Sequence, residues 1–129
     1  MAHYALVNQR TGAIVASHLE LADSAWTRLR GLLGRGELPA GHGMRIRPSG
    51  SVHMMFMRFP IDVVFVNRDD EVVKTVPGLQ PWRFSAARGA HAVYELSVGT
   101  IERYEILRGD PLAVQHVSDP TTTPAGPAA

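Results

Sequence analysis

The sequence predicts a mainly β domain, an antiparallel β sandwich or open barrel with one principal helix and one short helix. Short β-prone runs outnumber helical patterns by about six to two, and no regular strand–helix alternation favours a parallel, doubly wound sheet. The 129 residues suffice for one ordinary hydrophobic core but not for two domains. Because 45% of the residues are hydrophobic, the chain has the apolar surface to build that core.

The first third of the chain is predicted to form a hairpin and then the principal helix. Residues 4–7 and 13–16 are β-prone and flank a turn that contains Asn and Gly. Residues 23–33 begin at a capping Asp or Ser, carry apolar side chains at helical offsets and end in a glycine-rich stretch. A loop rich in Gly and Pro then leads to residues 44–47, whose alternation predicts a short strand.

The centre of the domain is predicted at residues 61–66, which are apolar on both faces of a strand. A polar turn follows, so residues 61–76 should form a second hairpin. Residues 77–89 predict a long loop, and their large side chains favour a functional segment. The remaining predicted elements are two strands and a short helical turn: residues 92–98, residues 111–117 and a turn capped by Thr100.

The chain is predicted to consist of one domain and a tail. Residues 1–117 are predicted to be a single β-rich domain and residues 118–129 a disordered tail, because the tail lacks large apolar side chains.

Composition excludes several classes of protein. The net charge of +1 does not favour binding to nucleic acid or to a membrane surface. The absence of cysteine excludes disulfides and thiolate metal centres. With no signal peptide and no membrane-spanning run, the prediction is a soluble cytoplasmic protein without membrane insertion.

Two acids inside apolar strands are the main candidates for chemistry. Asp62 lies within residues 61–66, and Glu95 lies within residues 93–96. Desolvation raises the pKa of a buried carboxyl group, and such a group can act as a general acid or base or as a metal ligand. A salt bridge from Arg58 to Asp62 is the structural alternative.

A second candidate lies in the long predicted loop, where Pro81, Trp82 and Arg83 are consecutive. An aromatic face beside a guanidinium group suits a sugar, a nucleotide or a peptide carboxylate. The alternative is that Trp82 closes the mouth of the barrel while Arg83 is solvated.

A third candidate is a copper site. On a continuous strand, His53, Met55 and Met57 would share one face, and an imidazole with two thioethers can hold Cu(I), with Met44 as a further sulfur ligand. Methionines more often fill gaps in a core, so core packing is favoured. No phosphate-binding loop, nucleophile elbow or zinc-protease helix is present, and no cofactor is predicted.

Basic residues gather in the first half of the chain. Between Arg28 and Arg47 there are five arginines and one glutamate, a local excess that could contact an acidic partner or a phosphate. A solvated face is the alternative, and no nucleic-acid-binding pattern accompanies the arginines.

Arg108, Gly109 and Asp110 have the sequence of a known adhesion tripeptide, but Gly and Asp before a strand that begins with Pro are typical of an ordinary turn, which is the prediction here.

Residues 53–65, His-Met-Met-Phe-Met-Arg-Phe-Pro-Ile-Asp-Val-Val-Phe, resemble the central signature of the family called domain of unknown function 192. Further segments resemble family motifs in the same order: residues 28–35, 43–44, 81–83, 94–99 and 109–110. The resemblance covers roughly residues 4–116 and implies a small, mostly β domain of bacteria and archaea with no established activity.

The resemblance also implies which residues matter. The most characteristic family positions fall on His53, Met57, Arg58, Pro60, Asp62 and Glu95, with Gly31 and Gly109 in structural places. Met54 and Met55 stand where the family has threonine and an aromatic residue, so a copper site would be peculiar to this chain.

Three functions follow from these candidates. The preferred hypothesis is a non-enzymatic binding module for a small polar ligand or a partner peptide. Its proposed ligand-binding residues are His53, Arg58, Asp62, Trp82, Arg83 and Glu95. The second hypothesis is a hydrolase or isomerase in which Asp62 or Glu95 is the general base and His53 the acid. The third is a protein-interaction adaptor that acts through the Arg28–Arg47 face.

Overall fold

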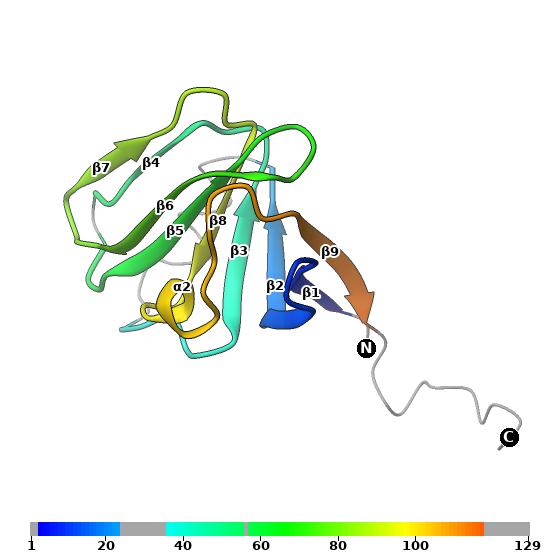
Figure 1. Ribbon diagram of the computed structural model, residues 1–129. Coiled ribbons are helices and arrows are strands. Elements are labelled where there is room, and N and C mark those ends of the chain that lie inside the picture. Colours follow the sequence, from blue (N-terminus) through cyan, green and yellow to red (C-terminus); the bar gives the residue numbers. More distant parts are fainter. Residues whose placement is uncertain (1–2, 24–35, 56, 118–129) are drawn as a thin grey trace, which may run out of the picture.

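The computed structural model describes residues 3–23, 36–55 and 57–117, which form a seven-stranded sheet and a small two-stranded sheet (Figure 1). The elements are β1 His3–Asn8, β2 Ala13–Ala22, β3 His42–Ile46, β4 Ser51–His53, β5 Ile61–Val66, β6 Val72–Leu79, β7 Phe84–Ala86, β8 Ala92–Leu96, α2 Thr100–Arg103 and β9 Leu112–Val117. The prediction of a mainly β fold is confirmed.

The large sheet is open and mixed. Its strand order is β6-β5-β8-β3-β2-β1-β9, so β6 and β9 form its edges, and β4 pairs with β7 in the small sheet. Neighbouring strands of the large sheet are antiparallel except β2 and β3, which are parallel. A parallel pair needs a crossover connection, and the segment between β2 and β3 provides it. The antiparallel prediction therefore holds for every pair in this sheet but one.

Both predicted hairpins are confirmed. β1 and β2 pair across the turn at residues 9–12, and β5 pairs with β6. β2 extends to Ala22, well beyond the predicted end, because its second half pairs with β3. The predicted loop at residues 77–89 is shorter than expected, since β6 continues to Leu79 and β7 pairs with β4.

The predicted cap of the short helix by Thr100 is wrong, whereas the predicted principal helix and the predicted tail stay predictions. The N-cap of α2 is Gly99 at φ 95°, and Thr100 is the first helical residue, whose hydroxyl donates to the Ser97 carbonyl oxygen at 2.7 Å. The predicted principal helix lies almost wholly within residues 24–35, and the predicted tail is residues 118–129. Both segments lie outside the described residues.

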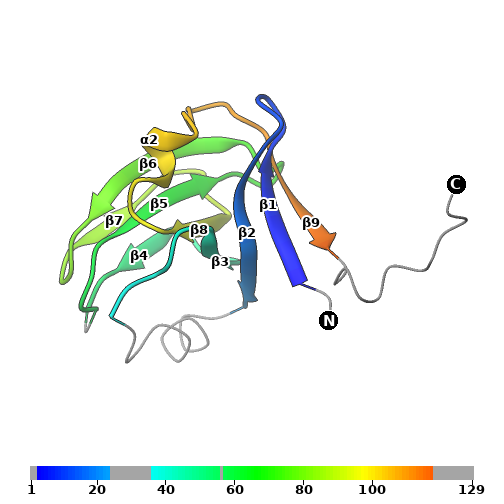
Figure 2. The ribbon, with the colours of Figure 1, turned by 90° about the horizontal axis from the view of Figure 1, so that it is seen from below.

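The sheet packs a core on each face. Along β5, Val63 and Phe65 belong to the core that β4 covers, while Val64 and Val66 belong to the core that α2 covers. Figure 2 shows α2 and β4 on opposite sides of β5. All six residues of β5 are buried, which confirms the prediction of a strand that is apolar on both faces.

Gly43 allows β3 to approach β8 closely. A Cβ atom at this position would lie 2.8 Å from Leu96 Cδ2 and 3.1 Å from the Glu95 carbonyl oxygen, which belongs to a paired strand and cannot move away easily. We expect Gly43→Ala to lower the free energy of unfolding by about 1–3 kcal/mol, the usual cost of overpacking. Urea denaturation measures the loss. Gly36→Ala is the matched control, because a Cβ there meets open space; equal effects of the two variants would contradict the prediction.

Candidate functional site

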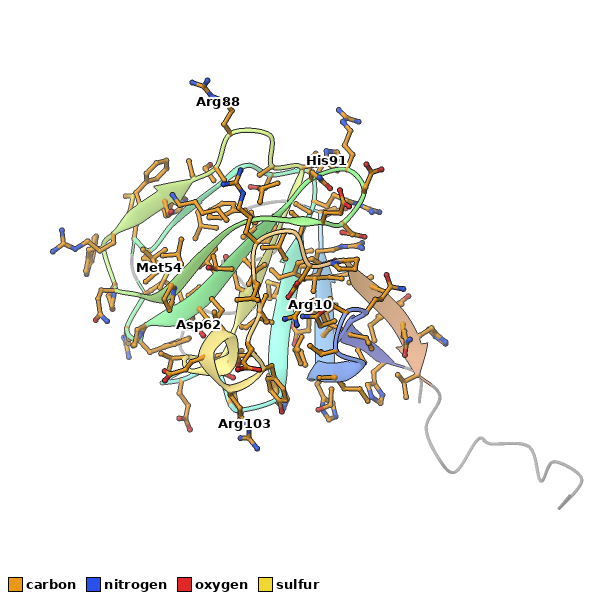
Figure 3. All side chains as sticks on the ribbon, in the orientation of Figure 1. Arg10, Met54, Asp62, Arg88, His91 and Arg103 are labelled. Carbon is orange, nitrogen blue, oxygen red and sulfur yellow. The ribbon has the colours of Figure 1, made fainter. Side chains whose placement is uncertain are left out.

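Asp62 is a buried carboxylate bound by three backbone amides. It is 1% exposed and lies at the start of β5 (Figure 3). Oδ1 accepts a hydrogen bond from the Gly78 amide at 2.9 Å, and Oδ2 accepts bonds from the Gly99 and Ile101 amides at 3.1 and 2.8 Å. Asp62 therefore joins β5 to the end of β6 and to the start of α2. Arg58, the predicted salt-bridge partner, is exposed and is not among these donors.

Asp62 and Glu95 point to opposite faces of the sheet. In the β5–β8 register Asp62 pairs with Leu96, while Glu95 pairs with Val63. Side chains of directly paired residues lie on the same face, and successive side chains on a strand alternate. Glu95 is fully buried on the face of Val63, and Asp62 lies on the face of Leu96 beside α2. The two acids do not form a pair around one site.

The predicted residues His53, Trp82 and Arg83 come together on the small sheet. His53 and Phe84 are cross-strand partners, and the side chains of both are exposed. The Trp82 amide donates to the Met54 carbonyl oxygen, and the Met54 amide donates to the Arg83 carbonyl oxygen, each at 2.7 Å. We call residues 51–54 with 82–86 the β4–β7 ribbon. Figure 1 shows it alongside β6 and β5, on which its buried residues Val52 and Met54 pack.

The β4–β7 ribbon has one buried and one exposed side. Val52, Met54 and Ser85 are buried beneath it. Trp82 is 63% exposed and Phe84 is 66% exposed, so Trp82 does not close a barrel mouth. Trp82 lies in a turn and has φ 68°, a left-handed conformation that is costly for a bulky aromatic residue; strained residues of this kind cluster at functional sites. The ribbon therefore presents aromatic and cationic side chains from a paired backbone.

The continuous strand needed for the copper candidate is not present. β4 ends at His53, and a turn follows in which the Met57 amide donates to the Met54 carbonyl oxygen. As a result Met55 is 46% exposed, while Met57 and Met44 are buried in the core. Among the residues that the structure describes, no three His, Asp or Glu side chains are grouped so that they could hold a metal ion.

Only part of the Arg28–Arg47 face can be followed, because Arg28 lies outside the described residues. Arg45 is half-buried and Arg47 is exposed. The Tyr94 hydroxyl donates to Asp70 Oδ1 at 3.3 Å. Burial raises the pKa of Tyr94 well above its ordinary value, the charge of Asp70 adds to the rise, and Arg45 opposes it. Arg45 therefore lies close to Tyr94, its partner in the β3–β8 register, and the Arg28–Arg47 face stays a prediction.

Sequence reasoning missed a buried polar cluster at Asp110. This residue is 3% exposed and accepts bonds from Arg10 Nε at 2.6 Å, Asn8 Nδ2 at 2.8 Å and the Leu107 amide at 2.8 Å. Arg10 also donates to the Glu105 carbonyl oxygen. The cluster joins the β1–β2 turn to the turn before β9. The predicted turn at residues 108–110 is confirmed, but the sequence pattern gave no sign that Asp110 is buried.

Sequence reasoning also missed a column of three histidine rings. His3 of β1, His18 of β2 and His42 of β3 stack with 4.8 Å between neighbouring ring centroids and interplanar angles of 9° and 10°. His18 and His42 are direct partners in the parallel β2–β3 pair. Without that pairing nothing in the sequence brings the three residues together.

Two hollows are lined by described residues outside the β4–β7 ribbon. One, of about 370 Å³, lies between the β5–β6 and β7–β8 turns and includes Arg68 and His91. Another, of about 260 Å³, lies beside α2 and includes Ser97 and Arg103. The predicted ligand-binding residues line neither hollow. Within the described ranges, no helix has the length and apolar character to span a bilayer.

These features define a small, mainly β domain. Its carboxylates Asp62 and Asp110 are buried and bound by groups of the chain itself, and the β4–β7 ribbon exposes aromatic and cationic side chains. The family model DUF192, described as "Uncharacterized ACR", matches residues 6–114. The chain belongs to this family.

Curated relatives come from archaea. A UPF0127 protein of Pyrococcus furiosus is 34% identical over 115 residues, covering 83% of this chain and 95% of the relative. A UPF0127 protein of Thermococcus sibiricus is 32% identical over 114 residues, covering 81% of this chain and 71% of the relative.

Solved structures from bacteria share the fold. A protein of unknown function from Novosphingobium aromaticivorans has a TM-score of 0.71 at 25% identity, covering 85% of this chain and 82% of that one. A protein titled a putative transcription regulator from Sinorhizobium meliloti also has a TM-score of 0.71, at 23% identity, covering 88% and 94% of the two chains. The second likeness concerns the fold alone.

Proposed function

We propose that this protein is a non-enzymatic binding module and that the β4–β7 ribbon is its ligand-binding surface. The observation that carries the proposal is the exposure of Trp82 and Phe84 beside Arg83 on a hydrogen-bonded ribbon. Exposed apolar patches mark interaction sites, and a rigid backbone lowers the entropy lost when a ligand binds. The ligand is a small polar molecule or a partner peptide.

The two acids support this proposal over an enzyme. Asp62 uses both carboxylate oxygens to accept backbone amides, and Glu95 is buried on the other face of the sheet. A general base must reach a substrate proton within hydrogen-bonding distance. Because Asp62 and Glu95 are buried and out of reach of a ligand on the surface, we assign the binding role to His53, Arg83 and their exposed neighbours.

The melting temperature of the purified protein, measured with organic acids, sugar phosphates, nucleotides and a peptide pool, tests the proposal. A ligand at a hundredfold excess over its dissociation constant adds roughly 2.7 kcal/mol and raises the melting temperature by several degrees. We expect such a shift in the parent protein and its loss in Trp82→Ala. Leu107→Ala, which removes an equally exposed apolar side chain from another turn, should keep the shift. A shift that survives Trp82→Ala, or none across the panel, argues against the ribbon.

A further inference from the structure

We infer that the partner of the β4–β7 ribbon is an acidic peptide segment that also carries apolar side chains. This inference rests on the proposed function, because it names the class of ligand for the same surface. Its basis is a strongly one-sided local charge next to exposed apolar side chains.

The two segments that contain the ribbon carry only positive charges. Residues 47–60 and 80–91, which contain the ribbon and its flanking turns, hold four arginines and neither Asp nor Glu. The whole chain has 13 basic and 12 acidic residues, so this separation is local. All four arginine side chains are exposed: Arg47, Arg58, Arg83 and Arg88. Figure 3 shows Arg88 extending away from the domain. Such a surface attracts carboxylates, and guanidinium groups bind them in a bidentate manner.

Apolar side chains lie next to these charges. Trp82 and Phe84 are two residues apart, and the exposed Met55 lies two residues after the end of β4. Aromatic side chains, Met and Arg are the residue types enriched in the centres of protein interfaces. A ligand that binds both features must therefore combine anionic groups with aliphatic or aromatic ones, and a peptide provides that combination along one chain.

The shape and the surrounding charge favour a peptide over other anions. The two described hollows are lined by other residues than those of the ribbon. A long polyanion would extend past the ribbon, where the β5–β6 turn presents Asp69 and Glu71. Nucleic acids and anionic membranes are attracted by an extended positive field, and this chain has a net charge of only +1. A short acidic segment matches the size of the basic area.

Selection from a random dodecapeptide library on the immobilised full chain tests the inference. We expect the selected peptides to contain Asp or Glu near aromatic or aliphatic residues. Synthetic copies should bind roughly tenfold more weakly to Arg83→Glu and to Trp82→Ala. Their affinity for Arg103→Glu should be nearly unchanged, because Arg103 lies on α2, away from the ribbon (Figure 3). Affinity should also fall as salt is raised.

The outcomes separate the inference from the proposed function. Neutral or basic peptides whose binding depends on Trp82 would overturn the inference and leave the binding surface in place. If no selected peptide depends on Trp82 or Arg83, the inference fails; the proposed function fails as well if the melting-temperature panel gives no shift that depends on Trp82. If oligothymidine or phosphatidylglycerol vesicles bind more tightly than the best peptide, the inference is wrong and the ligand belongs to that other class. Circular dichroism of every variant shows that a loss of binding does not reflect unfolding.

Discussion

Replacing Asp62 with Ala is expected to lower the free energy of unfolding by about 3–5 kcal/mol, because three backbone amides, of which that of Ile101 is buried, lose a charged acceptor at once. Those amides belong to Gly78, Gly99 and Ile101, so the change removes the side-chain link from β5 to the end of β6 and to the start of α2. Asp62→Asn should cost less, about 2 kcal/mol, since one oxygen remains to accept hydrogen bonds while the new amide group faces backbone donors.

Denaturant unfolding and amide hydrogen exchange measure this effect together. In Asp62→Asn, which keeps the side-chain shape, the Ile101 and Gly78 amides should exchange faster than in the parent protein, while β1 amides should change little. Asp69→Ala is the control, because Asp69 is an exposed acid in a turn of the same hairpin. If Asp62→Ala is as stable as Asp69→Ala, Asp62 does not have the role assigned here.

Acid is expected to destabilise the protein through Asp110. The pKa of Asp110 is lowered from 3.8 to about 2, mainly by the hydrogen bond from Arg10. Burial opposes this shift, and the hydrogen bonds from the Leu107 amide and from Asn8 add to it. A folded-state pKa below the unfolded value gives stability that is complete above about pH 4 and is lost as the pH falls toward 2. Because Arg10 is 42% exposed, solvent screens part of the effect, and we expect a loss of about 1–2 kcal/mol.

The slope of stability against pH between 4 and 2 checks this prediction. In Asp110→Asn the contribution of this group to the slope should vanish, and the variant should be less stable than the parent by about 2–3 kcal/mol at neutral pH, since Arg10 and the Leu107 amide lose a buried acceptor. Glu102→Gln, an exposed acid in α2, should leave the slope unchanged. An unaltered slope in Asp110→Asn would mean that other carboxyl groups govern acid unfolding.

The candidate site was partly predictable from the residues. The aromatic and cationic pattern at residues 81–83 indicated a functional segment, and the structure places these residues on the exposed side of the ribbon with His53. The acids at positions 62 and 95 were recognisable as unusual, because carboxyl groups inside apolar strands need partners. Their partners were not recognisable. Asp62 binds backbone amides, which carry no side-chain signature in the sequence.

Local patterns were enough to establish the fold class, the two hairpins and the doubly covered strand β5. Apolar periodicity and turn residues act over a few positions, so the chain specifies these elements without distant contacts. The length and composition established a core large enough for one domain.

Long-range strand pairing determined the remaining features. The β5–β8 register placed Asp62 and Glu95 on opposite faces of the sheet. The parallel β2–β3 pair brought His18 next to His42, and the pairing of β1 with β9 brought Asn8 close to Asp110 across about a hundred positions. Register is set by which strands become neighbours, and a shift of one residue reverses every side chain on a strand. For that reason the roles of these buried polar groups follow from the folded chain and not from local sequence.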